Sequence, residues 1–119
     1  MQYVLLIHQG TTPLPGSEEW AALSAEEQNR VYADYAALNE LPEVTPGLPL
    51  GLPEQATTVR VQDGQLAVTD GPIAGPKDAI GGWLVVEADN LDAALEIAGR
   101  VPAARLGGAI EVRPVQTYW

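Results

Sequence analysis

The residue best suited to chemistry in this sequence is His8, the only histidine of the chain. Histidine exchanges a proton near neutral pH, so His8 could act as a general base or a proton shuttle. Asp70 precedes Gly71 and Pro72, and its carboxylate could bind a substrate or orient His8. Each residue also has an ordinary structural role, because a histidine can bond to backbone or water and an aspartate can stabilise a turn. The sequence leaves both roles open.

Two cations could hold an anionic ligand near these residues. Lys77 is the only lysine and lies in an expected loop, where simple exposure to solvent is the plainer interpretation. Arg105 follows Pro102 and two alanines. It could bind a carboxylate through two hydrogen bonds, or pair with one of the 16 acidic residues of the chain.

Other kinds of site are poorly supported. The chain has no cysteine and one histidine, which argues against a zinc site or a thiolate nucleophile. No calcium-loop series or phosphate-binding glycine loop occurs, and neither Ser17 nor Ser24 lies in a nucleophile motif. We therefore expect no metal and no cofactor. Five aromatic residues could line a cleft or fill the core: Tyr3, Trp20, Tyr32, Tyr35 and Trp83.

Length and charge narrow the class of protein. The 119 residues fit one domain, residues 1–119, with a core of ordinary size. A net charge of −10 opposes binding to nucleic acids and to anionic membrane surfaces, because both require clustered cations. The apolar run at residues 3–7 is too short for a signal peptide or a membrane span. We therefore expect a cytoplasmic protein that binds neither nucleic acid nor membrane.

The first half of the chain contains a strand and a helix. Residues 2–8 are a short aliphatic run typical of a buried strand, and residues 9–23 are expected to form a loop. A helix is predicted to begin after Ser24, whose hydroxyl can form a capping box with Glu27, and to end before Pro42. Its buried stripe would be Val31, Tyr35 and Leu38.

The second half begins with a proline-rich segment, 42–53, which we expect to be an irregular edge of a sheet. Residues 57–61 and 66–69 alternate in polarity around Asp63-Gly64, a pair typical of a two-residue hairpin turn. Further strands are predicted at 83–86 and 109–115. Between them, Asp89 or Asn90 can cap a second helix, whose apolar face would be Leu91, Ala94, Leu95 and Ala98.

This order of elements predicts an α+β fold in which an antiparallel sheet carries two helices on one face and a β-hairpin is inserted. In the first strand, Tyr3, Leu5 and Ile7 point to one face, whereas Val4 and Leu6 point to the other. Both faces of the sheet are therefore apolar, and the helices cover only one. We predict a homodimer that packs sheet against sheet.

Two stretches of the chain resemble a known family. Residues 68–83 contain Asp70-Gly71-Pro72-Ile73, Lys77 with the acidic residue after it, and Gly81-Gly82. Residues 91–115 continue the similarity. Together they resemble the DGPF-domain group of the YCII-related proteins, with Ile73 in the place of the usual Phe. The resemblance implies a ferredoxin-like fold of the dimeric α/β-barrel type, and a bacterial source.

The resemblance does not carry an activity with it. Some YCII-type members are thought to use a His–Asp pair, with the histidine in the first helix and the aspartate before a proline near the end of the second helix. Here the helix at 24–40 has no histidine, and Val101 precedes Pro102. The pair therefore cannot be transferred to this chain.

Three hypotheses follow. The first is a small-molecule site in a cleft beside the sheet, with His8 and Asp70 as acid–base candidates and Lys77 or Arg105 holding an anion. The second is a non-catalytic interaction module, because some relatives are encoded next to, or fused to, extracytoplasmic-function sigma factors; the acidic face of the helix at 24–40 would be its contact surface. The third is a homodimer that has lost its activity.

Overall fold

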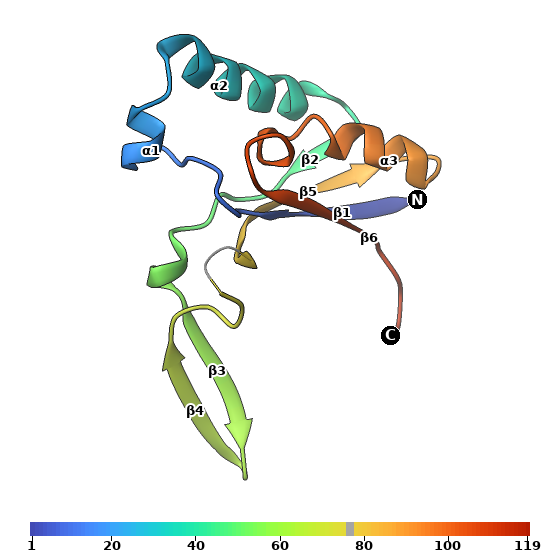
Figure 1. Ribbon diagram of the computed structural model, residues 1–119. Coiled ribbons are helices and arrows are strands. Elements are labelled where there is room, and N and C mark those ends of the chain that lie inside the picture. The colour runs from blue at the N-terminus through green and yellow to red at the C-terminus, as the bar shows by residue number, and fades with distance from the viewer. Residues whose placement is uncertain (76–77) are drawn as a thin grey trace.

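The computed structural model describes residues 1–75 and 78–119 and shows an α+β fold (Figure 1). The strands are β1 (Gln2–His8), β2 (Val44–Pro46), β3 (Thr57–Gln62), β4 (Gln65–Asp70), β5 (Ile80–Glu87) and β6 (Ala109–Pro114). The helices are α1 (Glu18–Ala21), α2 (Ala25–Glu40) and α3 (Leu91–Ala98), and two 3₁₀ turns lie at Pro53–Gln55 and Pro102–Ala104.

Four strands form an antiparallel sheet in the order β2-β5-β1-β6, and β3 pairs with β4 in a separate two-stranded sheet. Helices α2 and α3 cover the same face of the larger sheet (Figure 1). The hairpin β3–β4 is inserted between β2 and β5. This is the predicted ferredoxin-like arrangement of an antiparallel sheet, two helices on one face and a hairpin insertion.

The core lies between the sheet and the helices. The alternation of β1 is confirmed: its odd-numbered apolar residues are buried on the helix side, and Leu5 pairs in register with Leu84 of β5 and Val112 of β6. Leu38 of α2 and Val101 are buried in this core opposite the sheet. A core built mainly of apolar side chains is what an α+β two-layer fold needs to hold its helices on the sheet.

The predicted helix boundaries are confirmed. The Ser24 hydroxyl accepts a hydrogen bond of 3.1 Å from the Glu27 N–H, and α2 ends at Glu40, before Pro42. Asn90 caps α3 by accepting from the Ala93 N–H at 2.9 Å. These caps supply partners to backbone N–H groups that have none inside the helix.

Two local predictions were wrong. The expected loop at 9–23 contains the short helix α1, which Ser17 caps by accepting from the Trp20 N–H. The predicted face of α3 included Leu91 and Leu95, which are half exposed. Its buried residues are instead Ala94, Ile97 and Ala98. The helix is only eight residues long, and apolar residues lie on two of its sides. The side with the two small alanines faces the sheet, and the side with the two leucines does not.

The proline-rich segment contributes β2, a three-residue edge strand, as predicted. The hairpin turn is also confirmed, because Asp63 and Gly64 both adopt positive φ angles, of 50° and 77°. Two successive positive φ angles are the mark of the type I′ turn that suits a two-residue hairpin.

The molecule is unusually extended for its mass. Its accessible surface is 8070 Å², whereas a monomeric protein of 12.6 kDa has about 6,200 Å². Its radius of gyration is 16.1 Å, against about 13.5 Å for a compact domain of this length. The hairpin projects from the side of the sheet opposite α2 and α3 (Figure 1). No described helix is long and apolar enough to span a bilayer.

Candidate functional site

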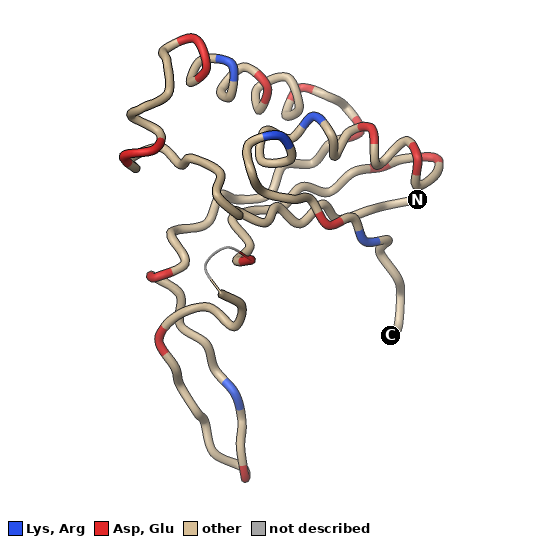
Figure 2. The backbone as a smooth tube through the Cα atoms, viewed as in Figure 1, with Lys and Arg blue, Asp and Glu red and all other residues tan. Residues whose placement is uncertain are grey.

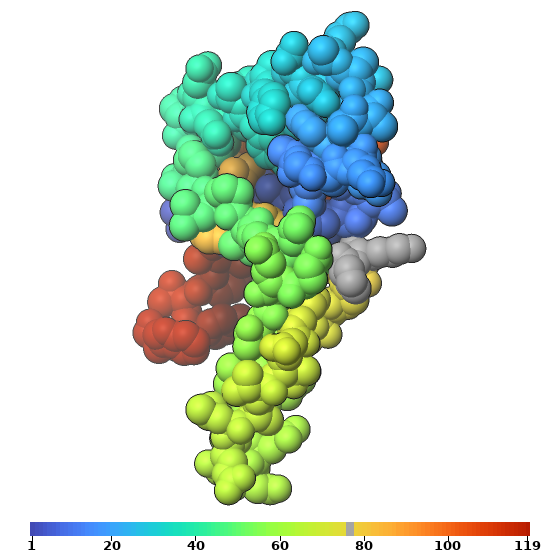
Figure 3. Space-filling view, turned by 90° about the vertical axis from the view of Figure 1, so that its left-hand side faces the viewer, coloured from blue at the N-terminus to red at the C-terminus, as the bar shows by residue number. Residues whose placement is uncertain are grey.

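A cavity of about 560 Å³ lies between α2 and the end of the sheet. Its volume falls within the range of small-molecule sites. Three segments far apart in the sequence form its walls: residues 9–15 with Trp20, the inner face of α2, and residues 46–52. In the space-filling view, the blue N-terminal segment and the green segment after β2 flank this region below α2 (Figure 3). Ile7 and Leu84 contribute from the sheet.

The cavity wall is mostly apolar, and its described residues carry no charge. Its polar members are the side chains of Gln9, Thr12, Asn39 and Gln55, together with the tyrosine hydroxyls. Gln9 Oε1 and Thr12 Oγ1 are buried and have no hydrogen-bond partner among the described residues. A buried polar group without a partner costs about 1–3 kcal/mol, so both atoms lower the stability of this part of the fold.

Aromatic rings form one side of the cavity. Trp20 of α1 and Tyr32 of α2 meet edge to face, with ring centroids 5.4 Å apart and planes at 74°. Gln28 Nε2 donates a 2.8 Å hydrogen bond to the Trp20 backbone oxygen, which fixes α1 against α2. Of the five aromatic residues expected in a cleft or in the core, Tyr3 lies in the core and the other four line this cavity.

Arg105 is placed beside this cavity but is already paired. Its Nη2 lies 2.8 Å from Oδ2 of Asp34 on α2, so the structure supplies the pairing with an acidic residue that the sequence left open. Its role in binding an anionic ligand stays a prediction. Burial raises the pKa of the Tyr35 hydroxyl above its usual range, and the positive charge of Arg105 partly offsets this effect.

The raised pKa of Tyr35 predicts that the fold loses stability at alkaline pH. Because the folded chain holds the Tyr35 proton more tightly than the unfolded chain, the stability contributed by this group is complete below pH 10 and falls as the pH rises through the raised pKa. We expect Tyr35→Phe to flatten the decline in the free energy of unfolding above pH 10. Urea unfolding between pH 8 and pH 11 measures this, with Tyr118→Phe, at an exposed position, as the control. Equal slopes in the two variants would contradict the assignment.

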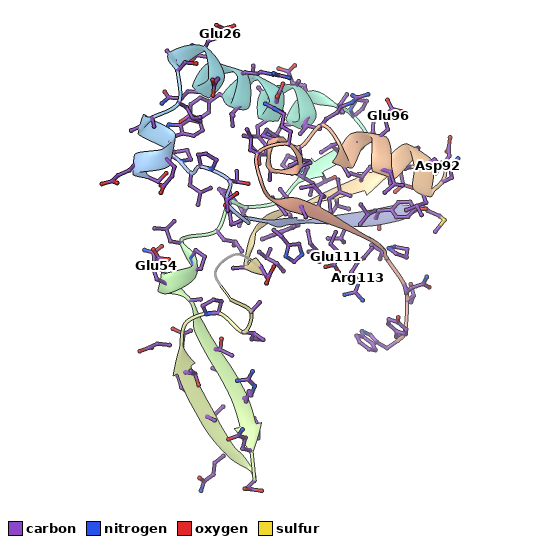
Figure 4. All side chains as sticks on the ribbon, in the orientation of Figure 1. Glu26, Glu54, Asp92, Glu96, Glu111 and Arg113 are labelled. Atoms are coloured by element: carbon purple, nitrogen blue, oxygen red, sulfur yellow. The ribbon has the colours of Figure 1, made fainter. Side chains whose placement is uncertain are left out.

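His8 lies on the other face of the sheet, at the end of β1. Its Nδ1 is 2.8 Å from the backbone oxygen of Asp78, and its Nε2 is 3.2 Å from Oε1 of Glu111. Both oxygens can only accept hydrogen bonds, so the two contacts form together only when both ring nitrogens carry protons. Glu111 also approaches Arg113, at 3.9 Å, and both are labelled on β6 in Figure 4.

His8 lines a second pocket of about 500 Å³ between the sheet and the base of the hairpin. The two pockets share Leu50, Gly51, Leu52 and Gln55. The second pocket is more open, and its described wall also includes Thr58, Pro72 and Asp78. It is therefore the place where acid–base chemistry by His8 would occur.

The other predicted site residues are not gathered around His8. Asp70 ends β4, where it pairs in register with Thr57, and its side chain is exposed. Among the described residues, the carboxylate in contact with His8 belongs to Glu111 and not to Asp70. Cooperation of Asp70 with His8 stays a prediction. Lys77 lies outside the described residues.

Sequence reasoning missed Gln9, Thr12 and Glu111. The alternation of residues 110–112 indicates that Glu111 faces away from the core, but only the pairing of β1 with β6 brings it to His8. Gln9 and Thr12 follow the first strand in an ordinary polar stretch, and no local signal marks them. Their burial results from the crossing of separate segments.

Comparisons with known proteins identify the family of this chain. The family model described as the YCII-related domain matches residues 1–118. An uncharacterized protein of Rhizobium meliloti (strain 1021) is 33% identical over 103 residues, which cover 82% of this chain and 83% of that protein. The family match spans almost the whole sequence, including both pockets. The chain therefore belongs to the YCII-related domain family.

Proposed function

We propose that this chain folds as one domain, forms a homodimer, and binds a neutral aromatic small molecule in the cavity beneath α2. The observation that carries the proposal is the largely apolar, concave wall, with aromatic rings on one side and only a few polar side chains, among them Gln9 and Thr12. A few polar groups in an apolar concave site are the usual design of a small-molecule pocket.

The wall chemistry indicates the class of ligand. Trp20, Tyr32 and Tyr35 offer ring faces and edges to a flat apolar body. The wall also carries a few polar side chains, those of Gln9, Thr12, Asn39 and Gln55, so the ligand would carry an N–H or O–H group that can hydrogen-bond to them. No described lining residue is charged, so the burial of an ionised ligand would be uncompensated.

Dimerisation through the sheet faces is the second part of the proposal. Val4 and Leu6 of β1 and Val85 of β5 lie on the face that α2 and α3 leave free, which we call the open sheet face, beside Glu111 and Arg113 of β6. These apolar side chains are half buried in the single chain. Packing two such faces together would remove them from water, in the manner of a homodimer core.

The test is thermal unfolding with matched probes. Benzamide, which is neutral and carries N–H donors, is compared with benzoate, which has a similar shape and a negative charge. We expect benzamide at ten times its dissociation constant to stabilise the fold by about 1.4 kcal/mol, or about 5 °C. We expect no shift with benzoate. The opposite order of the two probes would contradict the proposal and favour anion binding by Arg105.

Thr12→Val separates the site from a general effect on stability. This variant removes the unpartnered hydroxyl and keeps the shape, so the free chain should gain up to about 1 kcal/mol while the benzamide shift falls. Thr11→Val, at the exposed neighbouring position, is the control. His8→Ala and Asp70→Ala should leave the benzamide shift intact, because neither residue lines the cavity.

Two outcomes would change the proposed site or the proposed function. A probe shift that survives in Thr12→Val but is lost in His8→Ala would place the site in the second pocket and support acid–base chemistry there. The absence of any shift, in a protein that unfolds cooperatively, would overturn ligand binding. It would favour the alternative role as an interaction module of sigma-factor systems. The positions of the acidic residues along α2 are shown in red in Figure 2.

A further inference from the structure

The hairpin β3–β4 has one apolar face and one polar face. In its register, Val59 lies opposite Val68 and Val61 lies opposite Leu66. Side chains alternate between the faces of a strand, so these four aliphatic residues share one face. The opposite face carries Thr58, Arg60, Gln62, Gln65, Ala67 and Thr69. This is the pattern of a strand pair that covers a hydrophobic surface on one side and meets water on the other.

The apolar face of the hairpin is uncovered in the single chain. Val59, Val61, Leu66 and Val68 are between 54% and 71% exposed. The hairpin stands away from the body of the molecule in both views (Figures 1 and 3). Its base is tied by the hydrogen bond from Thr58 Oγ1 to the Gly71 oxygen and by that from the Gly71 N–H to the Ala56 oxygen. A two-stranded hairpin alone is only marginally stable in water, so this face requires a partner surface.

We infer that the hairpin is a dimerisation arm, whose apolar face packs against the body of a second copy of this chain. The inference rests on the proposed homodimer and extends it beyond the open sheet face. The surface area supports a second copy as the occupant: the single chain exposes about 1,900 Å² more than a monomer of its mass. Obligate homodimers bury about 1,000 Å² or more on each subunit, so an interface of that class would account for the excess.

The position of the arm fits the same dimer. It projects on the side of the sheet that lacks helices, where the open sheet face lies (Figure 1). Strands of six residues reach about 20 Å, and two packed sheets lie about 10 Å apart. An arm of this length therefore extends past the sheet of a second copy packed on the open sheet face. By two-fold symmetry, the arm of each chain would pack against the body of the other chain.

The charge pattern also favours self-association at this face. The chain carries a net charge of −10, which opposes the approach of a second copy. Between the base of the hairpin and its tip, the apolar face presents only Val59, Val61, Leu66 and Val68. Asp70 shares this face at its base, opposite Thr57, and Asp63 lies in the turn at the tip, so it is the middle of the arm that a second copy can meet without bringing acidic side chains together. The single cation of the hairpin, Arg60, lies on its polar face.

The test places the same charges on the two faces of the arm. The double variant Val61→Glu with Leu66→Glu alters the apolar face, and Gln62→Glu with Gln65→Glu is the matched control on the adjacent pair of the polar face. Sedimentation equilibrium gives the dimer dissociation constant of each protein. We expect the first variant to weaken the dimer by about 100-fold or more, because it removes two buried aliphatic side chains per arm. The control should stay within about threefold of the unmodified chain.

A spin label provides a readout that needs no charge in the arm. The chain has no cysteine, so Leu66→Cys and Gln65→Cys each give one labelling position. We expect a label at position 66 to be immobilised at dimer-forming concentrations and released on dilution, whereas a label at position 65 stays mobile. Mobility at position 66 in the dimer would overturn the inference.

The outcomes distinguish the arm from the dimer itself. A dimer that tolerates Val61→Glu with Leu66→Glu as well as it tolerates the control would overturn the arm and leave the sheet-face dimer intact. A monomer at all concentrations in the unmodified chain would overturn both. Ligand binding in the cavity beneath α2 is measured separately and does not depend on either result.

Discussion

Replacing Gly10 with alanine is expected to lower the free energy of unfolding by about 2–5 kcal/mol. Gly10 has a φ angle of +57°, in the left-handed region that disfavours residues with a Cβ atom. A Cβ atom there would also meet the backbone oxygen of Gly107 and lie 2.8 Å from the Cα atom of Gly108. These are backbone atoms at the approach to β6, so they cannot rotate away as a side chain would.

Gly16→Ala is the matched control for this prediction. Gly16 also has a positive φ angle, of +92°, but its added Cβ atom would have no described heavy atom within 4 Å. We expect it to show only the cost of backbone strain, about 1–2 kcal/mol. Urea unfolding followed by tryptophan fluorescence measures both variants. Equal losses would contradict the close approach of the chain after β1 to the chain before β6.

Leu5→Ala is the second large effect, with an expected loss of about 2–5 kcal/mol. Leu5 is 0% exposed at the centre of the sheet, between Leu84 of β5 and Val112 of β6. Removal of its side chain leaves a cavity that the paired strands on both sides hold open. The loss should be the same at low and high protein concentration, because Leu5 faces the helices and not the proposed dimer.

Leu6→Ala, at the next position, tests the other face. Leu6 is half buried and lies on the open sheet face. In dilute protein we expect a loss smaller than that of Leu5→Ala, since less apolar surface is removed from the single chain. At concentrations that favour the dimer the loss should grow. A loss independent of concentration would contradict a dimer through the open sheet face.

Much of the fold could be predicted because its signals are local. Ser24 and Asn90 cap helices through hydrogen bonds to residues three positions away. Asp63-Gly64 closes its hairpin through two positive φ angles that few other pairs adopt easily. The rotation of α3 could not be predicted, because its eight residues offer two apolar faces and the sheet beneath selects one.

The candidate site was predictable only in part, for the same reason. The position of His8 at a strand end follows from the aliphatic run before it. Its carboxylate partner does not, because Glu111 is 103 positions later and reaches His8 through the register of β1 with β6. Arg105 likewise meets Asp34 across the gap between α2 and the 3₁₀ turn before β6.

The residues alone were enough to predict the family, the order of the strands and of the two longer helices, and the inserted hairpin. These depend on polarity, capping and turn residues within a few positions of one another. The three-dimensional arrangement was needed to show that Gln9 and Thr12 line a largely apolar cavity, and that the apolar face of the hairpin is exposed. Cavities and uncovered faces are properties of the space between segments, and that space exists only once distant parts of the chain have packed together.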